Sequence, residues 1–210
     1  EVTEFTDYVT PNTSLEDGDL DANYFQTLAY LEEFNENNGT HLVSAAEIHV
    51  EPMGAYSYKY KSIDDIAEGA TVAVPNDPSN EARALNVLVS AGLIKVKEGD
   101  LITVADIIEN PKNLQFTELE AAQLPRALDD IDIAVINGNY ALDADLDVTK
   151  DAIFVEDENS QEMIARRNVL AVKEGNEKSE KIKDLIEVLT SDDVRTFIEE
   201  QYKGAVVPVF

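Results

Sequence analysis

The chain has 210 residues, of which 44% are apolar, so it can bury the core of one large domain or of two small lobes. It carries 43 acidic and 16 basic residues, and a formal charge of −27 repels nucleic-acid phosphates and anionic membrane surfaces. We therefore expect no nucleic-acid partner. The absence of cysteine excludes thiol catalysis, disulfides and thiolate metal sites.

Predicted strands dominate the first half of the chain. Short apolar or alternating runs between turn residues indicate strands, and apolar residues at one-face spacing indicate a helix. In chain order, the elements are a strand at Val2–Phe5, a helix at Leu28–Phe34 that ends at Asn37-Asn38-Gly39, and strands at Leu42–Val50, Ala55–Tyr60, Thr71–Val74 and Leu93–Val96.

Helices become more frequent in the second half. Because strands separated by helices are typical of parallel sheets covered on both faces, the pattern predicts an α/β fold. In chain order, we predict helices around Val104–Ile108 and Leu119–Leu128, strands at Ile131–Ile136, Ala152–Val155 and Asn168–Val172, and two closing helices around Ile182–Leu189 and Val194–Ile198.

The segment Thr71–Leu85 is the most informative stretch. It predicts a buried strand, a turn, and a helix that begins with Asp77 as N-cap and Pro78 in the first turn. The backbone N–H groups near Asn80 would then point at an anion, and Arg83 would add a fork for a carboxylate. The alternative is a well-capped helix whose arginine pairs with an acid at the surface.

Polar side chains lie at the ends of two further strands. Asn137 comes directly after the strand Ile131–Ile136, and Asn168 opens a later strand. Open α/β sheets bind ligands at strand ends, and amides beside an arginine suit a zwitterion. Either asparagine could instead be a turn residue. Aromatic residues near the start of the chain, which could line a pocket or belong to the core, are Tyr8, Tyr24 and Phe25.

Signals for catalysis are weak. The chain has no G-x-S-x-G, H-E-x-x-H, P-loop or G-x-G-x-x-G motif, and its two histidines are His41 and His49. Adjacent acids such as Asp64-Asp65 are common by chance in so acidic a chain, which leaves a general-acid pair open without selecting one. We predict no catalytic residue, no metal site and no cofactor.

Several long segments together resemble the methionine-binding lipoproteins of bacterial ABC importers, the NlpA/MetQ group. They follow one another in the family's order from one end of the chain to the other. The segments are Tyr8-Val-Thr-Pro-Asn, Asp21-Ala-Asn-Tyr-Phe-Gln, His49-Val-Glu-Pro-Met-Gly-Ala-Tyr-Ser, Val74-Pro-Asn-Asp-Pro-Ser-Asn-Glu-Ala-Arg-Ala-Leu, Leu124-Pro-Arg-Ala-Leu-Asp-Asp, Val135-Ile-Asn-Gly-Asn-Tyr-Ala and Tyr202-Lys-Gly-Ala-Val-Val-Pro.

The resemblance implies a fold of the periplasmic-binding-protein type, with two lobes that each have a largely parallel sheet flanked by helices. Lobe I would comprise residues 1–56 and 160–210, and lobe II residues 57–159, with the ligand cleft between them. Crossing strands near 51–60 and 157–167 would join the lobes. The implied function is extracytoplasmic binding of L-methionine and its delivery to an ABC permease with its ATPase.

The family's ligand residues correspond to positions in this chain where the motifs match. Tyr8 and Phe25 would surround the thioether, and Asn80 with Arg83 would bind the carboxylate. Amides that would hold the ligand backbone are Asn137 and Asn168. Thr27 lies at a pocket position where the family usually has a histidine. His49 belongs to a family motif, with a structural role equally open.

Three departures from the family pattern widen the expected ligand range. One is Thr27, and another is the run Gln161-Glu-Met-Ile-Ala-Arg-Arg before Asn168. The third is the start of the chain at the family's second strand, so a strand–helix unit of roughly 30–35 residues and the lipid-bearing cysteine would precede it. The alternatives are a receptor for another small amino acid or a methionine-containing dipeptide, and an acid-dependent enzyme on a two-lobe scaffold.

Overall fold

The computed structural model describes residues 1–157 and 165–210 and divides the chain into two compact units. Unit 1 comprises Glu1–Glu51 and Asn159–Phe210, and unit 2 comprises Pro52–Glu158. The sequence-based boundary after residue 56 assigns Gly54–Tyr56 to the first lobe, but this strand pairs within the sheet of unit 2. The variant run that begins at residue 161 lies mostly outside the described residues.

Unit 1 is built on a four-stranded sheet with the order β1-β10-β2-β11. Every pair of neighbouring strands in it is antiparallel, so the expectation of a largely parallel sheet is wrong for this unit. The reason is that β10, which comes from the far end of the sequence, runs between β1 and β2. The strands are β1 (Asn23–Thr27), β2 (Leu42–Val50), β10 (Asn168–Lys173) and β11 (Val207–Pro208).

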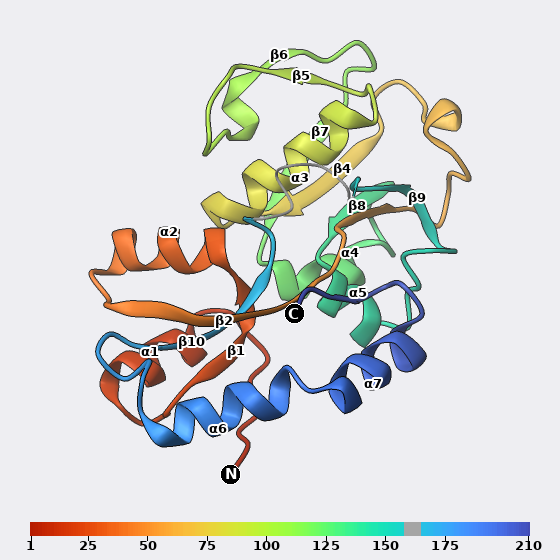
Figure 1. The fold of residues 1–210 in the computed structure, drawn as a ribbon. Coiled ribbons are helices and arrows are strands. Elements are labelled where there is room, and N and C mark those ends of the chain that lie inside the picture. Colours follow the sequence, from red (N-terminus) through yellow and green to blue (C-terminus); the bar gives the residue numbers. More distant parts are fainter. Residues whose placement is uncertain (158–164) are drawn as a thin grey trace. The chain divides into compact units, whose positions relative to one another are not determined.

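Helices flank this sheet, and Figure 1 shows α2 and α6 on opposite sides of it. Helix α2 ends where Gly39 takes a φ of 65°, a left-handed conformation that favours glycine. The predicted strand Val2–Phe5 is wrong, because this segment pairs with no strand of the described structure. The helices are α1 (Thr10–Asp17), α2 (Leu28–Asn38), α6 (Glu180–Leu189) and α7 (Asp192–Tyr202).

Unit 2 contains a mixed five-stranded sheet with the order β7-β4-β8-β3-β9. Strands β7, β4 and β8 run parallel, and β3 is antiparallel to β8 and β9. Alternate residues of β4 and β8 pack with α3 (Pro78–Ser90) in one hydrophobic core. The residues between them point to the opposite face of the sheet, where α4 (Leu124–Ala127) and α5 (Gly138–Asp143) lie. The strands are β3 (Gly54–Tyr56), β4 (Thr71–Pro75), β7 (Gln115–Leu119), β8 (Ile133–Ile136) and β9 (Ala152–Val155).

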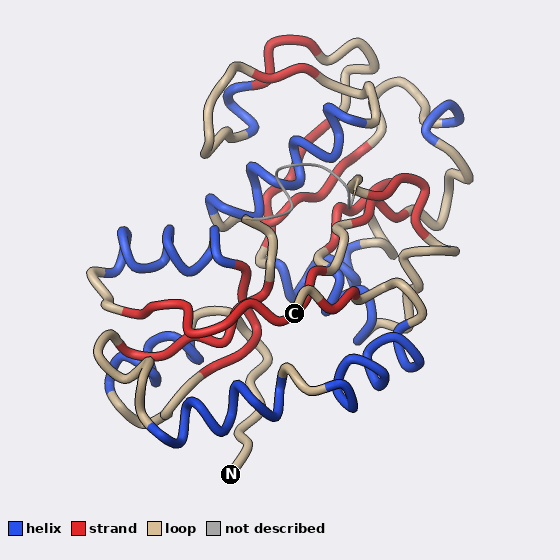
Figure 2. The backbone as a smooth tube through the Cα atoms, in the orientation of Figure 1, coloured by secondary structure: helices blue, strands red, loops and turns tan. Residues whose placement is uncertain are grey.

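A two-stranded ribbon, β5 with β6, lies apart from the larger sheet (Figure 2). The helix predicted around Val104–Ile108 is a single 3₁₀ turn that leads into β6, and the helix predicted from Leu119 starts later because β7 ends there. The remaining elements are η1 (Ile63–Asp65), α3 (Pro78–Ser90), β5 (Lys95–Val96), η2 (Val104–Asp106), β6 (Ile107–Glu109), η3 (Ala121–Gln123), α4 (Leu124–Ala127) and α5 (Gly138–Asp143).

In the described ranges, none of the helices combines the length and the apolar character that a membrane crossing requires.

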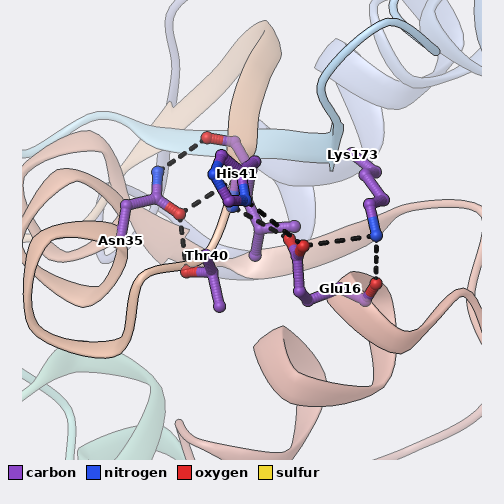
Figure 3. A network of polar contacts seen from close by, with 6 residues as sticks. Glu16, Asn35, Thr40, His41 and Lys173 are labelled. Carbon is purple, nitrogen blue, oxygen red and sulfur yellow. Dashed lines mark hydrogen bonds and ion pairs between the residues drawn. The ribbon is translucent and has the colours of Figure 1, made fainter.

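A polar network closes the turn between α2 and β2 (Figure 3). The Asn35 amide accepts from the Leu42 backbone and the Thr40 hydroxyl and donates to the Leu42 carbonyl. Glu16 of α1 accepts from the His41 backbone, and Lys173 donates to the Glu16 carbonyl and lies 3.2 Å from its carboxylate. Because these contacts join α1 to the α2–β2 turn and to β10, we interpret this network as structural.

A second polar network lies inside unit 1 and joins α1 to β1. Asn12 donates to the Gln26 side chain at 2.8 Å, and its own oxygen accepts from Asn23 at 2.9 Å and from Gln26 at 2.7 Å. All three side chains are buried. A buried network of this kind is stable only while each member keeps its partners. It therefore fixes α1 against β1.

We expect Asn12→Ala to lower the free energy of unfolding by about 2–4 kcal/mol, because Gln26 and Asn23 would each lose a buried partner. Urea unfolding measures this loss. The matched control is Asn176→Ala, at an exposed turn position, where the change stays within about 0.5 kcal/mol. Equal effects of the two substitutions would contradict a stabilising network.

Candidate functional site

In unit 2, the side chains of Asp77, Asn80 and Asn137 form a chain of hydrogen bonds at the start of α3. Asp77 is the N-cap, and its Oδ1 accepts from the Asn80 backbone N–H and from Asn80 Nδ2, both at 2.9 Å. The Asn80 oxygen accepts from Asn137 Nδ2 at 2.8 Å. Burial raises the pKa of Asp77, although the hydrogen bonds from Asn80 oppose that shift. The predicted strand, N-cap and helix start are confirmed.

The direction of these hydrogen bonds is set at Asp77, since an ionised carboxylate can only accept. Asn80 must therefore turn its nitrogen to Asp77 and its oxygen to Asn137. The Asn137 oxygen Oδ1 is left over, and it has no hydrogen-bond partner among the described residues. Asn137 is 5% exposed. A buried acceptor without a donor is costly, so this oxygen is suited to a ligand's N–H group.

Arg83 forms a buried ion pair with Glu156, directly after β9. Its Nε donates to both carboxylate oxygens at 3.1 and 3.0 Å, and its Nη2 donates to Oε2 at 2.5 Å. The side chains are 3% and 13% exposed. Arg83 thus has the acidic partner that the alternative interpretation of this helix expected, except that the acid is largely buried.

The same helix carries a buried carboxyl group, that of Glu81. Glu81 is buried, and its Oε1 accepts from the Val104 backbone N–H at 2.8 Å. Burial raises the pKa of Glu81 to about 7, and the neighbouring carboxyl groups of Glu118 and Asp77 add to that shift. Near neutral pH, Glu81 therefore holds a proton for a substantial fraction of the time.

Unit 1 brings the predicted aromatic residues together. The ring centroids of Tyr8 and Phe25 are 5.7 Å apart, and Tyr30 lies 5.6 Å from Tyr8 and 6.3 Å from Phe25. The Tyr30 hydroxyl donates to the Tyr8 carbonyl at 3.1 Å. Tyr8 and Phe25 are half-buried, so they offer a firm apolar surface that a thioether chain can cover.

Asn168 lies near this cluster in the sheet register, opposite Thr27 on β1 and His49 on β2. It is 2% exposed, and its Nδ2 has no hydrogen-bond partner in the described parts of the chain. The Thr27 hydroxyl oxygen accepts from the Tyr30 backbone N–H as the N-cap of α2. Asn168 and Thr27 thus bring two side chains that can donate hydrogen bonds to paired positions on neighbouring strands.

His49 has a structural partner in Tyr24. Burial lowers the pKa of His49 to about 4 and raises the pKa of Tyr24, so a neutral tyrosine hydroxyl and Nδ1 of a neutral imidazole share a hydrogen bond. The two rings also meet edge to face, with centroids 5.4 Å apart. This contact fixes the β2 residue opposite Asn168, which accounts for the histidine in the strand.

The predicted site residues thus form two groups, one in each unit. Sequence reasoning missed Glu156 and Tyr30, and it treated Asp77 only as a helix cap. An acid directly after the apolar run Ala152–Val155 was the available signal for Glu156. The described residues contain no cluster of histidine and acidic side chains that could hold a metal ion.

Two helix-flanked α/β units, each with a buried amide that has one polar atom without a partner among the described residues, are suited to binding a small polar solute. The chain belongs to the NlpA lipoprotein family, whose profile matches residues 1–210.

Particular relatives are similar along nearly the whole chain. The D-methionine-binding lipoprotein MetQ of Escherichia coli (strain K12) is 44% identical over 211 residues, which is 99% of this chain and 76% of that protein. The structure of a nutrient binding protein from Burkholderia cenocepacia bound to methionine is 47% identical with a TM-score of 0.96, covering 100% of this chain and 88% of that one. Lipoprotein Tp32 from Treponema pallidum is 41% identical with a TM-score of 0.92, covering 98% and 85%.

We expect the stability of unit 2 to fall as the pH rises from about 4.5 to about 7. The folded form of Glu81 keeps its proton over that range and the unfolded form releases it, so the folded state binds more protons. Glu81→Gln should flatten this slope and stabilise the protein more at pH 8 than at pH 5. Thermal melting across pH measures both effects. A slope that persists in Glu81→Gln would contradict this assignment.

Proposed function

We propose that this chain is the substrate-binding component of a bacterial ABC importer and that methionine is its ligand. Membership of the NlpA lipoprotein family supports the proposal, as does similarity to a nutrient binding protein that was solved bound to methionine. The named relatives are binding lipoproteins, which favours a receptor over the enzyme alternative. Binding without turnover is therefore the expected activity.

The observation that carries the proposal is a pair of open polar atoms on buried amides. Asn137 offers an acceptor and Asn168 a donor, and neither atom has a partner among the described residues. An amino acid has the complementary groups, because its ammonium donates and its carboxylate accepts. We assign Asn137 to the ammonium and Asn168 to the carboxylate, which Arg83 also attracts. Asn80 acts by fixing the Asn137 amide.

The thioether side chain of methionine suits the aromatic group of unit 1. Sulfur near the edge of an aromatic ring contributes favourably, and Tyr8 with Phe25 presents two such rings. Thr27 can donate its hydroxyl proton while its oxygen remains the helix cap. We assign Tyr8 and Phe25 to the thioether side chain of the ligand. We assign Thr27 to the polar group of the ligand that lies nearest to that side chain.

Delivery to a permease and its ATPase is the remaining part of the proposal. The relatives are named as lipoproteins, and one related structure is described as a periplasmic substrate-binding protein of an ABC transporter. We therefore infer an extracytoplasmic protein that a lipid anchor holds at the membrane.

Isothermal titration calorimetry against L-methionine, D-methionine and the other standard amino acids tests the ligand assignment. We expect saturable binding of methionine at micromolar concentration or below, with the ligand recovered unchanged by chromatography. Tighter binding of another amino acid would support the alternative receptor, and consumption of the ligand would support the enzyme.

Asn168→Ala should weaken methionine binding by about 1.5–3 kcal/mol, the contribution of a hydrogen bond to a charged group. The melting temperature of the ligand-free protein should barely change, because Nδ2 makes no hydrogen bond within the described structure that the substitution would remove. Calorimetry and thermal melting on the same sample separate the two effects. A large loss of stability with unchanged affinity would identify Asn168 as a structural residue instead.

Arg83→Ala should remove about 2–5 kcal/mol of methionine affinity, as expected when one side of a desolvated charge pair is deleted. Arg126→Ala is the matched control, since Arg126 is an exposed arginine of the same unit. Its affinity should equal that of the unmodified chain. Circular dichroism checks that both variants fold. Undiminished binding in a folded Arg83→Ala would exclude Arg83 from carboxylate recognition.

A further inference from the structure

Strand β1 contains one residue more than the segment of β10 that lies beside it (Figure 1). Tyr24 pairs with Leu170. Gln26, two residues further along β1, pairs with Val169, which is only one residue away on β10. Phe25 is therefore the extra residue of a β-bulge. A bulge re-aims side chains, because every residue after it changes the face of the sheet to which it points.

Two buried amides on β1 show the effect of the bulge. Asn23 and Gln26 are three residues apart, so in a regular strand their side chains would point to opposite faces of the sheet. Here Gln26 Nε2 donates to Asn23 Oδ1 at 2.9 Å, which places both side chains on one face. Their partners on β10 agree with this, because Ala171 and Val169 pack in one core with Leu15 of α1.

The bulge also decides the face on which Thr27 lies. Thr27 follows Gln26 and points to the face away from the buried amides, which its partner Asn168 shares. A regular β1 would instead keep Asn23, Phe25 and Thr27 on one face. The Thr27 side chain would then lie with the buried amides. One extra residue in the strand therefore brings Thr27 to the side of the sheet that Asn168 occupies.

The hydrogen bonds of Gln26 stabilise the bulge. Its Nε2 donates to Asn12 Oδ1 at 2.7 Å as well as to Asn23, and its Oε1 accepts from Asn12 Nδ2 at 2.8 Å. The bond from Gln26 to Asn23 spans the bulge. Gln26 is 3% exposed, so a strand that lost the bulge would leave buried amide groups without partners, which is costly.

We propose that Gln26 is a positioning residue of the ligand site, which keeps the bulge that presents the Phe25 ring and the Thr27 hydroxyl to the ligand. The inference rests on the proposed function and deepens it, because it names a residue that determines specificity through its neighbours. Without the bulge, Phe25 would leave its place beside Tyr8, where the ring centroids are 5.7 Å apart. A ligand would then lose contacts at the end of its side chain, while Asn168 would remain on β10.

The test compares two zwitterions, L-methionine and L-2-aminobutanoate, which lacks only the thiomethyl group. Calorimetry, with displacement titration for the weaker ligand, gives the ratio of the dissociation constant of 2-aminobutanoate to that of methionine. Gln26→Met keeps the length of the side chain and removes its hydrogen bonds. We expect this variant to lower the ratio about threefold or more, the effect of losing sulfur–aromatic contacts. If Gln26 only stabilised the fold, both ligands would weaken alike, and an unchanged ratio would overturn the proposal.

The matched control is Asn35→Ala. Asn35 is another amide of unit 1, and its hydrogen bonds to Leu42 and Thr40 close the turn before β2. Urea unfolding should show a loss of stability in this variant, while its ratio of dissociation constants should equal that of the unmodified protein. If Asn35→Ala lowered the ratio as much as Gln26→Met, specificity would follow stability alone, and the proposal would be wrong.

Two measurements keep the test decisive if Gln26→Met fails to fold. Asn23→Ala removes the bond that spans the bulge and keeps both bonds between Gln26 and Asn12, and an unchanged ratio in this variant would overturn the proposal. A ratio of about one in the unmodified protein would also overturn it. A protein that binds neither ligand would refute the proposed function, whereas methionine binding with an unchanged ratio in the variants would refute only this inference.

Discussion

One carboxylate that can only accept hydrogen bonds sets the chemistry of unit 2. Asp77 caps α3 and accepts from the backbone N–H and from Nδ2 of Asn80, which turns the Asn80 oxygen toward Asn137. An isolated asparagine amide could turn either way and would present a donor or an acceptor with similar ease. Here the order of bonds is fixed from the helix cap outward. The cap therefore decides which kind of atom the buried Asn137 keeps open.

Unit 1 reaches a comparable result by different means. Asn168 lies on β10, a strand with neighbours on both sides, so the sheet fixes its backbone while its Nδ2 stays open. Thr27 and His49 occupy the facing positions, and each is committed to another contact, the α2 cap and Tyr24 respectively. An amide held in this way would lose little further freedom on binding a ligand, which would favour affinity. Both units thus keep preorganised polar atoms.

Arg83 and Glu156 form a buried ion pair, so the charge of this arginine has an acidic partner within unit 2. Deleting one member of a buried pair leaves the other charge uncompensated, so the two residues act as a unit. The strongly acidic composition of the chain disfavours the approach of anions.

Patterns among neighbouring residues were sufficient to predict many of the helices and strands and some of the candidate site residues. Period-2 and period-3.6 patterns predicted β2, β9 and the last two helices, and Asp77 with Pro78 predicted the start of α3, because strand alternation and helix capping depend on adjacent residues. The tertiary structure alone decided that β10 enters between β1 and β2 and makes that sheet antiparallel. It also decided that Glu156 meets Arg83 and that Asn137 meets Asn80. These pairings join residues far apart in the chain, and such contacts follow from how strands and helices pack rather than from any local pattern.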